Sequence, residues 1–260
     1  MNQDNLASLD QPAVGISPLE WKARVELAAS YRLLAAFGFH DLTYNHLSAR
    51  VPDAPDRYLT KGQDQLFEHV TASSLLLYSL AGEKLCRSPG KVPPGGLVIH
   101  GGVLSARPDL MAAFHTHSPA SMGVSAQACG LLMVSQHSML FHDRLSYHSF
   151  EGFEFEPGMK DKIVRDLGSN KVMLMRNHGV LVCGRTVPEA YFLHHYLEMA
   201  CRAQVAALTA GGPSALVLPS AEICEHGARQ MEARGVVTAE GRDWPALMRL
   251  AGELAPGFDS

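Results

Sequence analysis

The sequence predicts one large α/β domain, and three observations support this fold class. First, 260 residues with 47% hydrophobic content are enough to bury one substantial core. Second, segments that open with helix-capping residues alternate with short apolar runs that are typical of strands. Third, the chain contains no internal repeat. We expect a flexible segment at 1–16, the domain itself at 17–212, and a C-terminal arm at 213–260 that takes part in oligomer contacts.

The charge and the N-terminal composition exclude several classes of partner. The formal net charge is -4, and acidic and basic residues are interspersed, so the chain has neither a basic stripe nor a polybasic patch. Residues 1–15 lack the apolar core of a signal peptide, and no window approaches the roughly 18 uninterrupted apolar residues of a membrane-spanning helix. The five cysteines lack Cys-x-x-Cys spacing. We therefore expect a cytoplasmic protein that binds a small molecule and neither nucleic acid nor a membrane.

A first helix is expected to start at Pro18 and to end before Gly38. Ser17 is a good N-cap, proline is tolerated at the first helical position, and Glu20 is placed to close a capping box. Apolar residues continue at helical spacing over 25–36, and glycine is a common residue after the last turn of a helix.

The segments that follow alternate in polarity or form short apolar runs, and both patterns predict strands. In order, we expect a turn entering a strand at 42–50, a strand near 58–60, a short helix or turn at 71–75, a strand at 76–80, a loop at 91–96 and a helix at 97–104. Pro108 is expected to end this last helix, because the residue before a proline disfavours helical geometry.

The second half of the chain continues this alternation. The expected elements are a strand at 110–117, a helix at 119–126 capped by Ser118, a candidate strand at 131–134, strands at 171–175 and 180–183, a helix at 187–210 opened by a capping box at Thr186, and a helix near 221–234. No geometry is predicted for the histidine-rich stretch at 136–148. The two strands around Asn177-His178-Gly179 are expected to form a hairpin with His178 at its tip.

Three histidines form the principal candidate site and predict a divalent metal ion. His115 and His117 are two residues apart in a predicted strand, so their side chains leave the same face roughly 6.5 to 7 Å apart. His178, at the hairpin tip, can supply a third imidazole. Three protein ligands leave a coordination position free for chemistry. Zinc is the favoured ion, with iron, manganese or cobalt as alternatives, because imidazole suits all four.

Taken together, the motifs resemble the class II aldolase/adducin superfamily over about residues 19–208. The matching pieces occur in the family's order: the segment Asn45-His46-Leu47-Ser48-Ala49-Arg50, the turn at 106–109, the strand end His115-Thr116-His117-Ser118, the hairpin Arg176-Asn177-His178-Gly179 and the helix start Glu189-Ala190. The resemblance implies a three-layer α/β/α fold with a central, mostly antiparallel sheet. It also implies a metal near a subunit boundary and a homotetramer.

One departure from the family pattern bears on the substrate. In the sugar-phosphate aldolases of this family, a glutamate four residues before the position of His100 assists metal binding and works as the general base. Here that position is Gly96, and the phosphate-binding serines are replaced by Pro93, Pro94 and Gly95. A proline donates no backbone hydrogen bond, so a phosphorylated substrate is not expected. The glycine-containing loop resembles the adducin-like branch instead.

With the glutamate absent, the proton-transfer group must lie elsewhere. His137 is the first candidate, because it falls near the position of a catalytic tyrosine in the aldolases, and His142, His148 and Glu151 follow. Each of these histidines could equally be a hydrogen-bonded loop residue. His100 could be a fourth metal ligand or could orient a neighbouring ligand.

Asn45, Arg50 and Gly96 are the candidates for substrate binding. Asn45 and Arg50 could hold a substrate carboxylate, while Gly96 belongs to the loop that holds phosphate in the aldolases. The structural alternatives are that the asparagine caps its own turn and that the arginine lies at a solvated strand end.

Three functions fit these residues. The leading hypothesis is a metal-dependent lyase that cleaves a C–C bond, by retro-aldol reaction or decarboxylation, in a small unphosphorylated hydroxy or keto acid. The second is an Fe(II)-dependent oxygenase that performs oxidative decarboxylation. The third is a non-catalytic, adducin-like interaction module. The complete set of three histidines with a free coordination position favours an enzyme.

Overall fold

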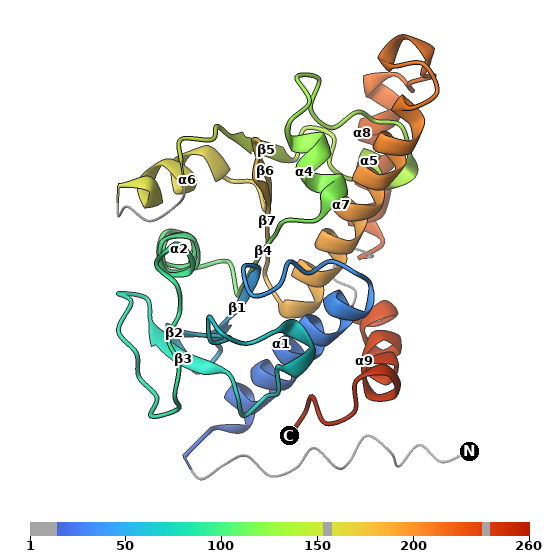
Figure 1. Ribbon diagram of the computed structural model, residues 1–260. Coiled ribbons are helices and arrows are strands. Elements are labelled where there is room, and N and C mark those ends of the chain that lie inside the picture. The colour runs from blue at the N-terminus through green and yellow to red at the C-terminus, as the bar shows by residue number, and fades with distance from the viewer. Residues whose placement is uncertain (1–14, 153–157, 236–239) are drawn as a thin grey trace, which may run out of the picture.

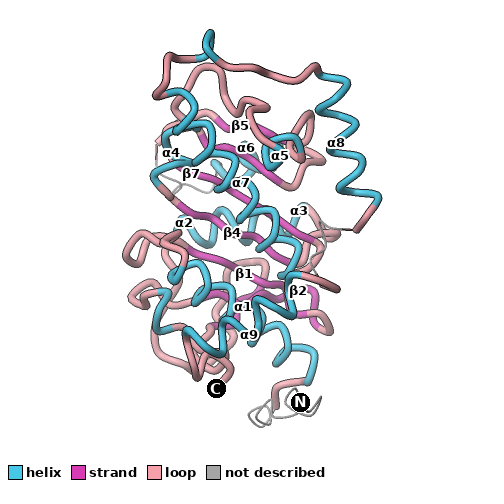
Figure 2. Tube along the Cα trace, turned by 90° about the vertical axis from the view of Figure 1, so that its right-hand side faces the viewer, coloured by secondary structure: helices cyan, strands magenta, loops and turns pink. Residues whose placement is uncertain are grey.

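One central sheet separates two layers of helices in the computed structural model, which describes residues 15–152, 158–235 and 240–260 (Figures 1 and 2). The sheet has the strand order β3-β2-β1-β4-β7-β6-β5, and every neighbouring pair is antiparallel except β5 and β6. This confirms the predicted α/β fold with a mostly antiparallel sheet. The predicted flexible segment falls almost entirely outside the described residues.

The strands include those expected at 42–50, 58–60, 76–80, 110–117, 171–175 and 180–183. Their bounds are β1 (His46–Val51), β2 (Ala54–Thr60), β3 (Leu76–Ser79), β4 (Ala112–Thr116), β5 (Leu145–His148), β6 (Val172–Met175) and β7 (Gly179–Gly184). Strand β4 lies in the middle of the sheet, between β1 and β7. The predicted hairpin is confirmed by the antiparallel pairing of β6 and β7, whose last residue pair is Met175 and Gly179.

The helices divide between the two faces of the sheet (Figure 1). One face carries α1 (Pro18–Ala36), α4 (Pro119–Ser125), α5 (Gln136–Met139), α7 (Val187–Leu208), α8 (Ala221–Ala233) and α9 (Asp243–Leu254). The other carries α2 (Pro94–Gly96), α3 (Gly102–Ala106) and α6 (Met159–Leu167). Short turns are η1 (Phe67–His69), the π-helical turn η2 (Leu97–Gly101) and η3 (Pro213–Ala215).

Two hydrophobic cores lie on opposite faces of the sheet, and successive strand residues alternate between them. In β4, Phe114 joins the core under α1 and α7, while Ala113 joins the core under α3 and α6. In β7, Val182 and Leu181 divide in the same way. Because both faces are covered, β6 and β7 are continuous apolar runs, whereas β1 alternates polar and apolar residues that are all buried.

The predicted N-caps of α1 and α7 are confirmed, but their glutamates bind elsewhere. Ser17 Oγ accepts the backbone N–H of Glu20 at 3.0 Å, and Thr186 Oγ1 accepts that of Glu189 at 3.1 Å. The Glu20 carboxylate then accepts a hydrogen bond from Arg24, and Glu189 accepts from Lys171 and from the backbone of Arg185. The serine and threonine caps therefore form without the reciprocal half of a capping box.

The candidate strand at 131–134 is wrong, because side chains take the backbone groups that a neighbouring strand would need. Leu131 N donates to the hydroxyl of Tyr147 at 3.0 Å, and Leu132 N donates to Gln204 Oε1 at 2.6 Å. The segment has no strand geometry. Short apolar runs do not reveal such tertiary partners.

The C-terminal arm contains α8, as expected, and a further helix, α9, that the sequence pattern did not predict. Trp244 of α9 packs edge-on against Tyr191 of α7, with ring centroids 5.8 Å apart. Arg144 forms ion pairs with Glu225 and Glu232 of α8, both at 2.6 Å. The arm therefore folds back on the body of this subunit, and its part in oligomer contacts stays a prediction.

The five cysteines are all free. In the part of the chain that the structure describes, no helix combines the length and the apolar character needed to cross a bilayer.

Tyr31 of α1 extends the ladder between β1 and β2 past its last residue pair, which joins Ser48 to Thr60. Its hydroxyl accepts the backbone N–H of Leu47 at 2.8 Å and donates to the carbonyl of the same residue at 2.6 Å. It also accepts from Lys61 N at 3.3 Å. Buried backbone groups of the strand that leads into the site thus depend on one hydroxyl.

We expect Tyr31→Phe to lower the free energy of unfolding by about 1 to 3 kcal/mol, because it leaves buried backbone groups unpaired. Urea denaturation at fixed protein concentration measures this change. Tyr44→Phe is the matched control, since Tyr44 is 66% exposed. Equal midpoints for the two variants would contradict this role of Tyr31.

Candidate metal centre

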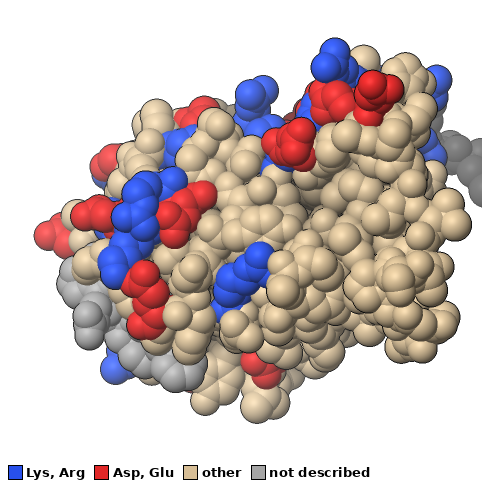
Figure 3. All heavy atoms as spheres, turned by 90° about the horizontal axis from the view of Figure 1, so that it is seen from above, with Lys and Arg blue, Asp and Glu red and all other residues tan. Residues whose placement is uncertain are grey.

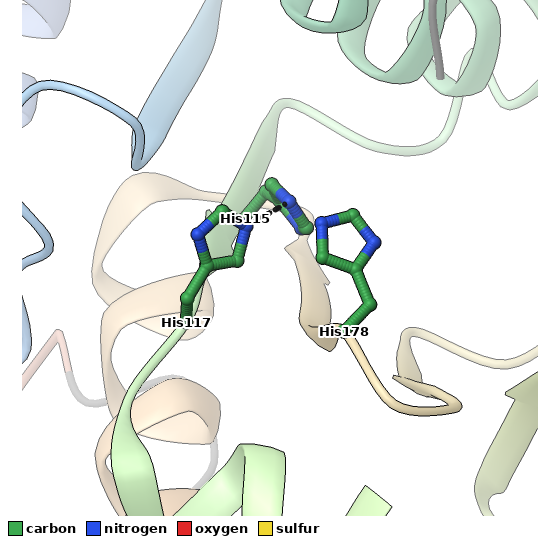
Figure 4. A group of neighbouring side chains, drawn as sticks. All are labelled: His115, His117 and His178. Carbon is green, nitrogen blue, oxygen red and sulfur yellow. Dashed lines mark hydrogen bonds between the residues drawn. The ribbon is translucent and has the colours of Figure 1, made fainter. Parts of the chain in front are cut away.

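His115, His117 and His178 converge at the end of β4, as the sequence predicts. Their ligand nitrogens all lie within 4.8 Å of one another. Figure 4 shows the three rings facing one another, two from the end of β4 and one from the hairpin between β6 and β7. The Nε2 atoms of His115 and His117 are 2.8 Å apart. The spacing of imidazoles around one cation, at about 2.0 to 2.1 Å from each nitrogen, suits this arrangement.

The Nδ1 atoms of two rings are engaged, which directs their Nε2 lone pairs to the same point. His115 Nδ1–H donates to the carbonyl of Val180 at 2.9 Å. His117 Nδ1–H donates to the Asp41 carboxylate at 3.2 Å. Two Nε2 lone pairs at 2.8 Å repel each other unless a proton or a cation lies between them. The donor set therefore fits a divalent metal ion, with the other ring nitrogens held in the manner of metal-binding histidines.

The hairpin reaches this point because Gly179 allows a close approach to β4. A Cβ at this position would lie 2.3 Å from the carbonyl oxygen of Thr116. The hairpin turn closes with a hydrogen bond from His178 N to the carbonyl of Met175, and Asn177 adopts a φ of 56°. Asparagine tolerates this left-handed conformation better than most residues. The sequence Asn177-His178-Gly179 is thus suited to bring an imidazole against the strand.

Asn45 fixes the backbone of the ligand segment. Its Oδ1 accepts the backbone N–H of His117 at 3.1 Å, and its Nδ2 donates to the carbonyl of Phe39 at 3.4 Å. The side chain is fully buried. Asn45 therefore joins the loop before β1 to the end of β4, a role that neither its predicted substrate contact nor a cap of its own turn describes.

A second pair of histidines lies beside the three ligands. His46 stands opposite His115 in the β1–β4 register, and their ring centroids are 5.1 Å apart. His46 Nδ1 is 2.7 Å from His100 Nε2, and His100 Nδ1 is 2.7 Å from Ser48 Oγ. Burial lowers the pKa of His100 to about 3 and lowers that of His46 well below its usual value. Both rings are therefore neutral at pH 7.

His100 consequently lies next to the three ligands and not among them. Both of its ring nitrogens contact other side chains, His46 on one side and Ser48 on the other. This departs from its prediction as a fourth ligand, because a nitrogen that accepts or donates a hydrogen bond has no lone pair left for a cation. Its position matches the alternative expectation of a residue that orients a neighbour.

The three catalytic candidates from the sequence have other partners. His137 packs against Tyr196 with ring centroids 4.8 Å apart, His142 lies 3.6 Å from Asp143, and His148 Nδ1 is 2.7 Å from Asp166. Among the described residues, none of the three forms a hydrogen bond or a ring contact with the metal ligands. His148 is hydrogen-bonded, as the alternative expected, but it ends β5 and is not in a loop, and His137 lies in α5; a catalytic role for the three stays a prediction.

Arg50 and Gly96 are both buried and serve packing in this structure. The Arg50 guanidinium donates to the carbonyls of Leu110, Pro55 and Leu104. It is only 4% exposed, so it is neither at a solvated strand end nor free to hold a carboxylate. A Cβ on Gly96 would lie 2.8 Å from Val92 Cγ1, so a larger residue there requires Val92 to move.

Sequence reasoning missed three residues near the site: His46, Asp41 and Lys61. Lys61 is 2% exposed, and its Nζ donates to the carbonyls of Thr43 and Gly62. Burial lowers its pKa to about 8. Only His46 carried a signal, since it stands next to Asn45 in a motif already singled out. The aspartate and the lysine come from loops whose paths no periodic pattern predicts.

A family model and a solved structure point to the same protein family. Residues 25–205 match the model of the class II aldolase and adducin N-terminal domain. The crystal structure of an aldolase II superfamily protein from Pseudomonas syringae has a TM-score of 0.89 and 38% identity, over 95% of this chain and 98% of that one.

Two further similar proteins are an aldolase and an adducin. An L-fuculose 1-phosphate aldolase from Glaciozyma antarctica PI12 has a TM-score of 0.79 at 23% identity, over 96% of this chain and 98% of that chain, a likeness of fold. Alpha-adducin from Mus musculus is 39% identical over 199 residues, which are 75% of this chain and 27% of alpha-adducin.

We expect Asp41→Asn to weaken zinc binding about 10- to 100-fold, because the negative charge that raises the basicity of His117 is lost while the amide oxygen can still accept from its Nδ1–H. Titration of metal-free protein with zinc against a competing chelator measures the affinity. Asp53→Asn is the matched control, since Asp53 is an exposed aspartate in the turn between β1 and β2. Unchanged affinity in Asp41→Asn would show that this contact does not support the site.

Proposed function

Because residues 25–205 match its model, the chain belongs to the class II aldolase and adducin N-terminal domain family, and we propose that it is a metal-dependent lyase. The reaction is cleavage of a C–C bond, by retro-aldol reaction or decarboxylation, in a small unphosphorylated hydroxy or keto acid. The observation that carries this proposal is the convergence of three imidazoles within 4.8 Å, with two of their Nδ1 atoms already engaged.

The three histidines would hold the ion through imidazole nitrogen and leave a position for substrate. A bound divalent cation polarises a carbonyl and stabilises the negative charge that develops when the adjacent bond breaks. Val180 and Asp41 keep two of the rings in the orientation that this requires. Zinc is the ion we propose, and iron, manganese and cobalt are the alternatives that suit three imidazoles.

The surroundings support an acid that carries no phosphate. Gly96 contributes no side chain, a Cβ there would require Val92 to move, and the neighbouring Pro93 and Pro94 offer no backbone donors. Lys61 provides a single positive charge close enough to His46 to lower its pKa. Two of its three N–H groups have carbonyl partners. A carboxylate needs fewer donors than a phosphate dianion, so one ammonium group suits the smaller anion.

The similarity to alpha-adducin favours a second candidate function, a non-catalytic interaction module that keeps a structural metal. The iron-dependent oxygenase differs from the lyase in its need for dioxygen. Three measurements distinguish the lyase, the oxygenase and the interaction module: turnover, the metal that supports turnover, and oxygen consumption.

We expect His115→Ala to abolish turnover and to lower the metal content, because it removes the most buried of the three ligands. Purified protein is stripped with a chelator and reloaded anaerobically with zinc, manganese, cobalt or iron. Release of carbon dioxide and aldehyde is then measured on a panel of unphosphorylated hydroxy and keto acids. His226→Ala, an exposed histidine of α8, is the control that keeps wild-type values.

Two outcomes would replace this proposal. Turnover only with iron, accompanied by oxygen uptake, would assign the oxygenase. A protein that binds metal and stays inert on the whole panel, with or without oxygen, would favour the interaction module.

We also propose a cytoplasmic homotetramer, with exposed apolar residues of the C-terminal arm in the interface. Figure 3 shows a broad face without charged side chains on its right-hand side. The segments 118–142 and 203–221 contain no Asp, Glu, Lys or Arg. Val217 is 95% exposed, and Leu218 and Ile223 are about half exposed. Exposed apolar patches of this kind are typical of contact surfaces between subunits.

We expect the double variant Val217→Asp and Leu218→Asp to dissociate the assembly, since it places charges in an apolar contact. Light scattering at micromolar concentration gives the mass of each species. Wild type at four times the chain mass, and a smaller species for the variant, support the proposal. A wild-type monomer would contradict it.

A further inference from the structure

Two side chains of α7 contact the residues on either side of the ligand candidate His117. Thr116 Oγ1 lies 2.7 Å from His194 Nε2, and the Ser118 hydroxyl donates to the Glu198 carboxylate. Thr116, His194 and Glu198 have no exposed surface, and Ser118 is 2% exposed. The end of β4 is thus joined to the helix by two buried polar contacts.

The extended chain at 115–118 explains why these residues divide between the metal centre and the helix. Successive residues of a strand point to opposite faces, so His115 and His117 leave one face while Thr116 and Ser118 leave the other. Ser118 keeps an extended backbone, with φ -70° and ψ 147°. Each residue directed at the metal centre therefore has a neighbour directed at α7.

The spacing of the two contacts matches between the helix and the strand. His194 and Glu198 are four residues apart, which is about 6 Å along a helix axis. Thr116 and Ser118 are two residues apart, which is about 6.7 Å along a strand. Both contacts can therefore form at once. Together they fix where the ligand segment lies along the helix as well as how far it lies from the helix.

The tight turn between β7 and α7 sets this register. β7 is antiparallel to β4, and α7 packs back along β7, so the helix runs in the direction of β4. Gly184 ends β7, and a Cβ there would lie 2.5 Å from Ala190 N and 2.7 Å from the carbonyl oxygen of Thr186. A larger residue at position 184 would push the start of α7 away from the sheet. The glycine thus lets α7 approach β4 closely.

The Glu198 carboxyl is poorly suited to a role in packing alone. A buried carboxyl costs free energy unless it is hydrogen-bonded. Among the described residues its hydrogen bond goes to Ser118, and its Oε1 atom has none. An apolar side chain of similar size would fill the same space without this cost. The carboxyl therefore serves its contact with the ligand segment.

We propose that Glu198 and His194 are positioning residues of the metal centre, an inference that rests on the metal centre of the proposed function. They act through Ser118 and Thr116, the two chain neighbours of His117. By holding both neighbours they fix the backbone from which the His117 ring projects. The face of α7 is thereby coupled to the geometry of the ligands on the other side of the sheet.

Glu198→Leu removes the acceptor and keeps a side chain of similar size, whereas Glu198→Gln keeps an acceptor oxygen for Ser118. The probe is cobalt(II), titrated into metal-free full-length protein against a competing chelator, because its visible absorption bands report the geometry of its ligands. We expect the cobalt affinity of Glu198→Leu to fall about 10- to 100-fold, with altered bands, as for other residues that orient metal ligands. Glu198→Gln should restore the wild-type bands, because its amide oxygen still accepts.

Gln204→Leu is the matched control, because it removes a buried polar group from the same helix. Gln204 has no exposed surface, accepts the backbone N–H of Leu132 at 2.6 Å and donates to the carbonyl of Gly130 at 2.7 Å. None of its described hydrogen bonds goes to residues 115–118. We expect Gln204→Leu to lower the urea midpoint of the metal-free protein and to keep the wild-type cobalt affinity and bands.

The outcomes separate the positioning role from the metal centre itself. Wild-type affinity and bands in folded Glu198→Leu would overturn the assignment and leave the metal centre intact. Equal losses of affinity in Glu198→Leu and Gln204→Leu would also overturn it, since general loosening of the helix would then explain the change. A wild-type protein that binds no cobalt would overturn the metal centre, and the positioning role with it.

Thr116→Val covers the case in which Glu198→Leu does not fold. Valine has the shape and the strand preference of threonine and lacks only the hydroxyl that contacts His194. We expect Thr116→Val to lower the cobalt affinity and to alter the cobalt bands. Wild-type bands in folded Thr116→Val would show that the contacts with α7 do not set the ligand geometry, and would overturn the proposal.

Discussion

The pairing of β4 with β1 on one side and β7 on the other is the constraint on which the site depends. It brings His46, His115 and the hairpin of His178 together from segments more than sixty residues apart in the chain. The register decides which side chains meet, because a shift of one residue would turn His115 into the opposite core. Gly179 permits the close contact between β7 and β4 that completes the arrangement.

Hydrogen bonds then orient the imidazole rings of His115 and His117. Val180 of β7 contacts the ligand segment from one side, and Asp41 and Asn45 of the loop before β1 contact it from the other; each contact fixes a ring or its backbone. Such orientation before binding reduces the rotamer freedom that a ligand would otherwise have to restrict. The site is thus arranged in advance, with the Nε2 atoms of His115 and His117 directed to a common point.

The glycine at position 96 leaves its loop without a functional side chain at this position. Val92 fills the space into which a side chain at this position would extend, so the loop contributes shape and no functional group. Polar groups beside the three ligands come instead from the loop before β1, which carries Asp41 and Asn45, and from β1 itself, where His46 contacts His100 of the π-helical turn η2. The family fold is retained with a glycine at position 96.

The sequence by itself determined the fold class, the starts of α1 and α7, the β6–β7 hairpin and the pairing of His115 with His117, because these follow from local periodicity, caps and short spacings; the pairing of β4 with β7 brought His178 to them. Only the tertiary structure decided the partners of His46 and His100, the burial of Arg50, the role of Asn45 and the irregular course of 131–134. Each of these depends on a hydrogen bond between residues distant in the chain, such as Leu132 with Gln204, and no local pattern encodes such a partner. The helix α9 belongs to the same class, since its apolar residues pack against α1 and α7 only after the chain has folded.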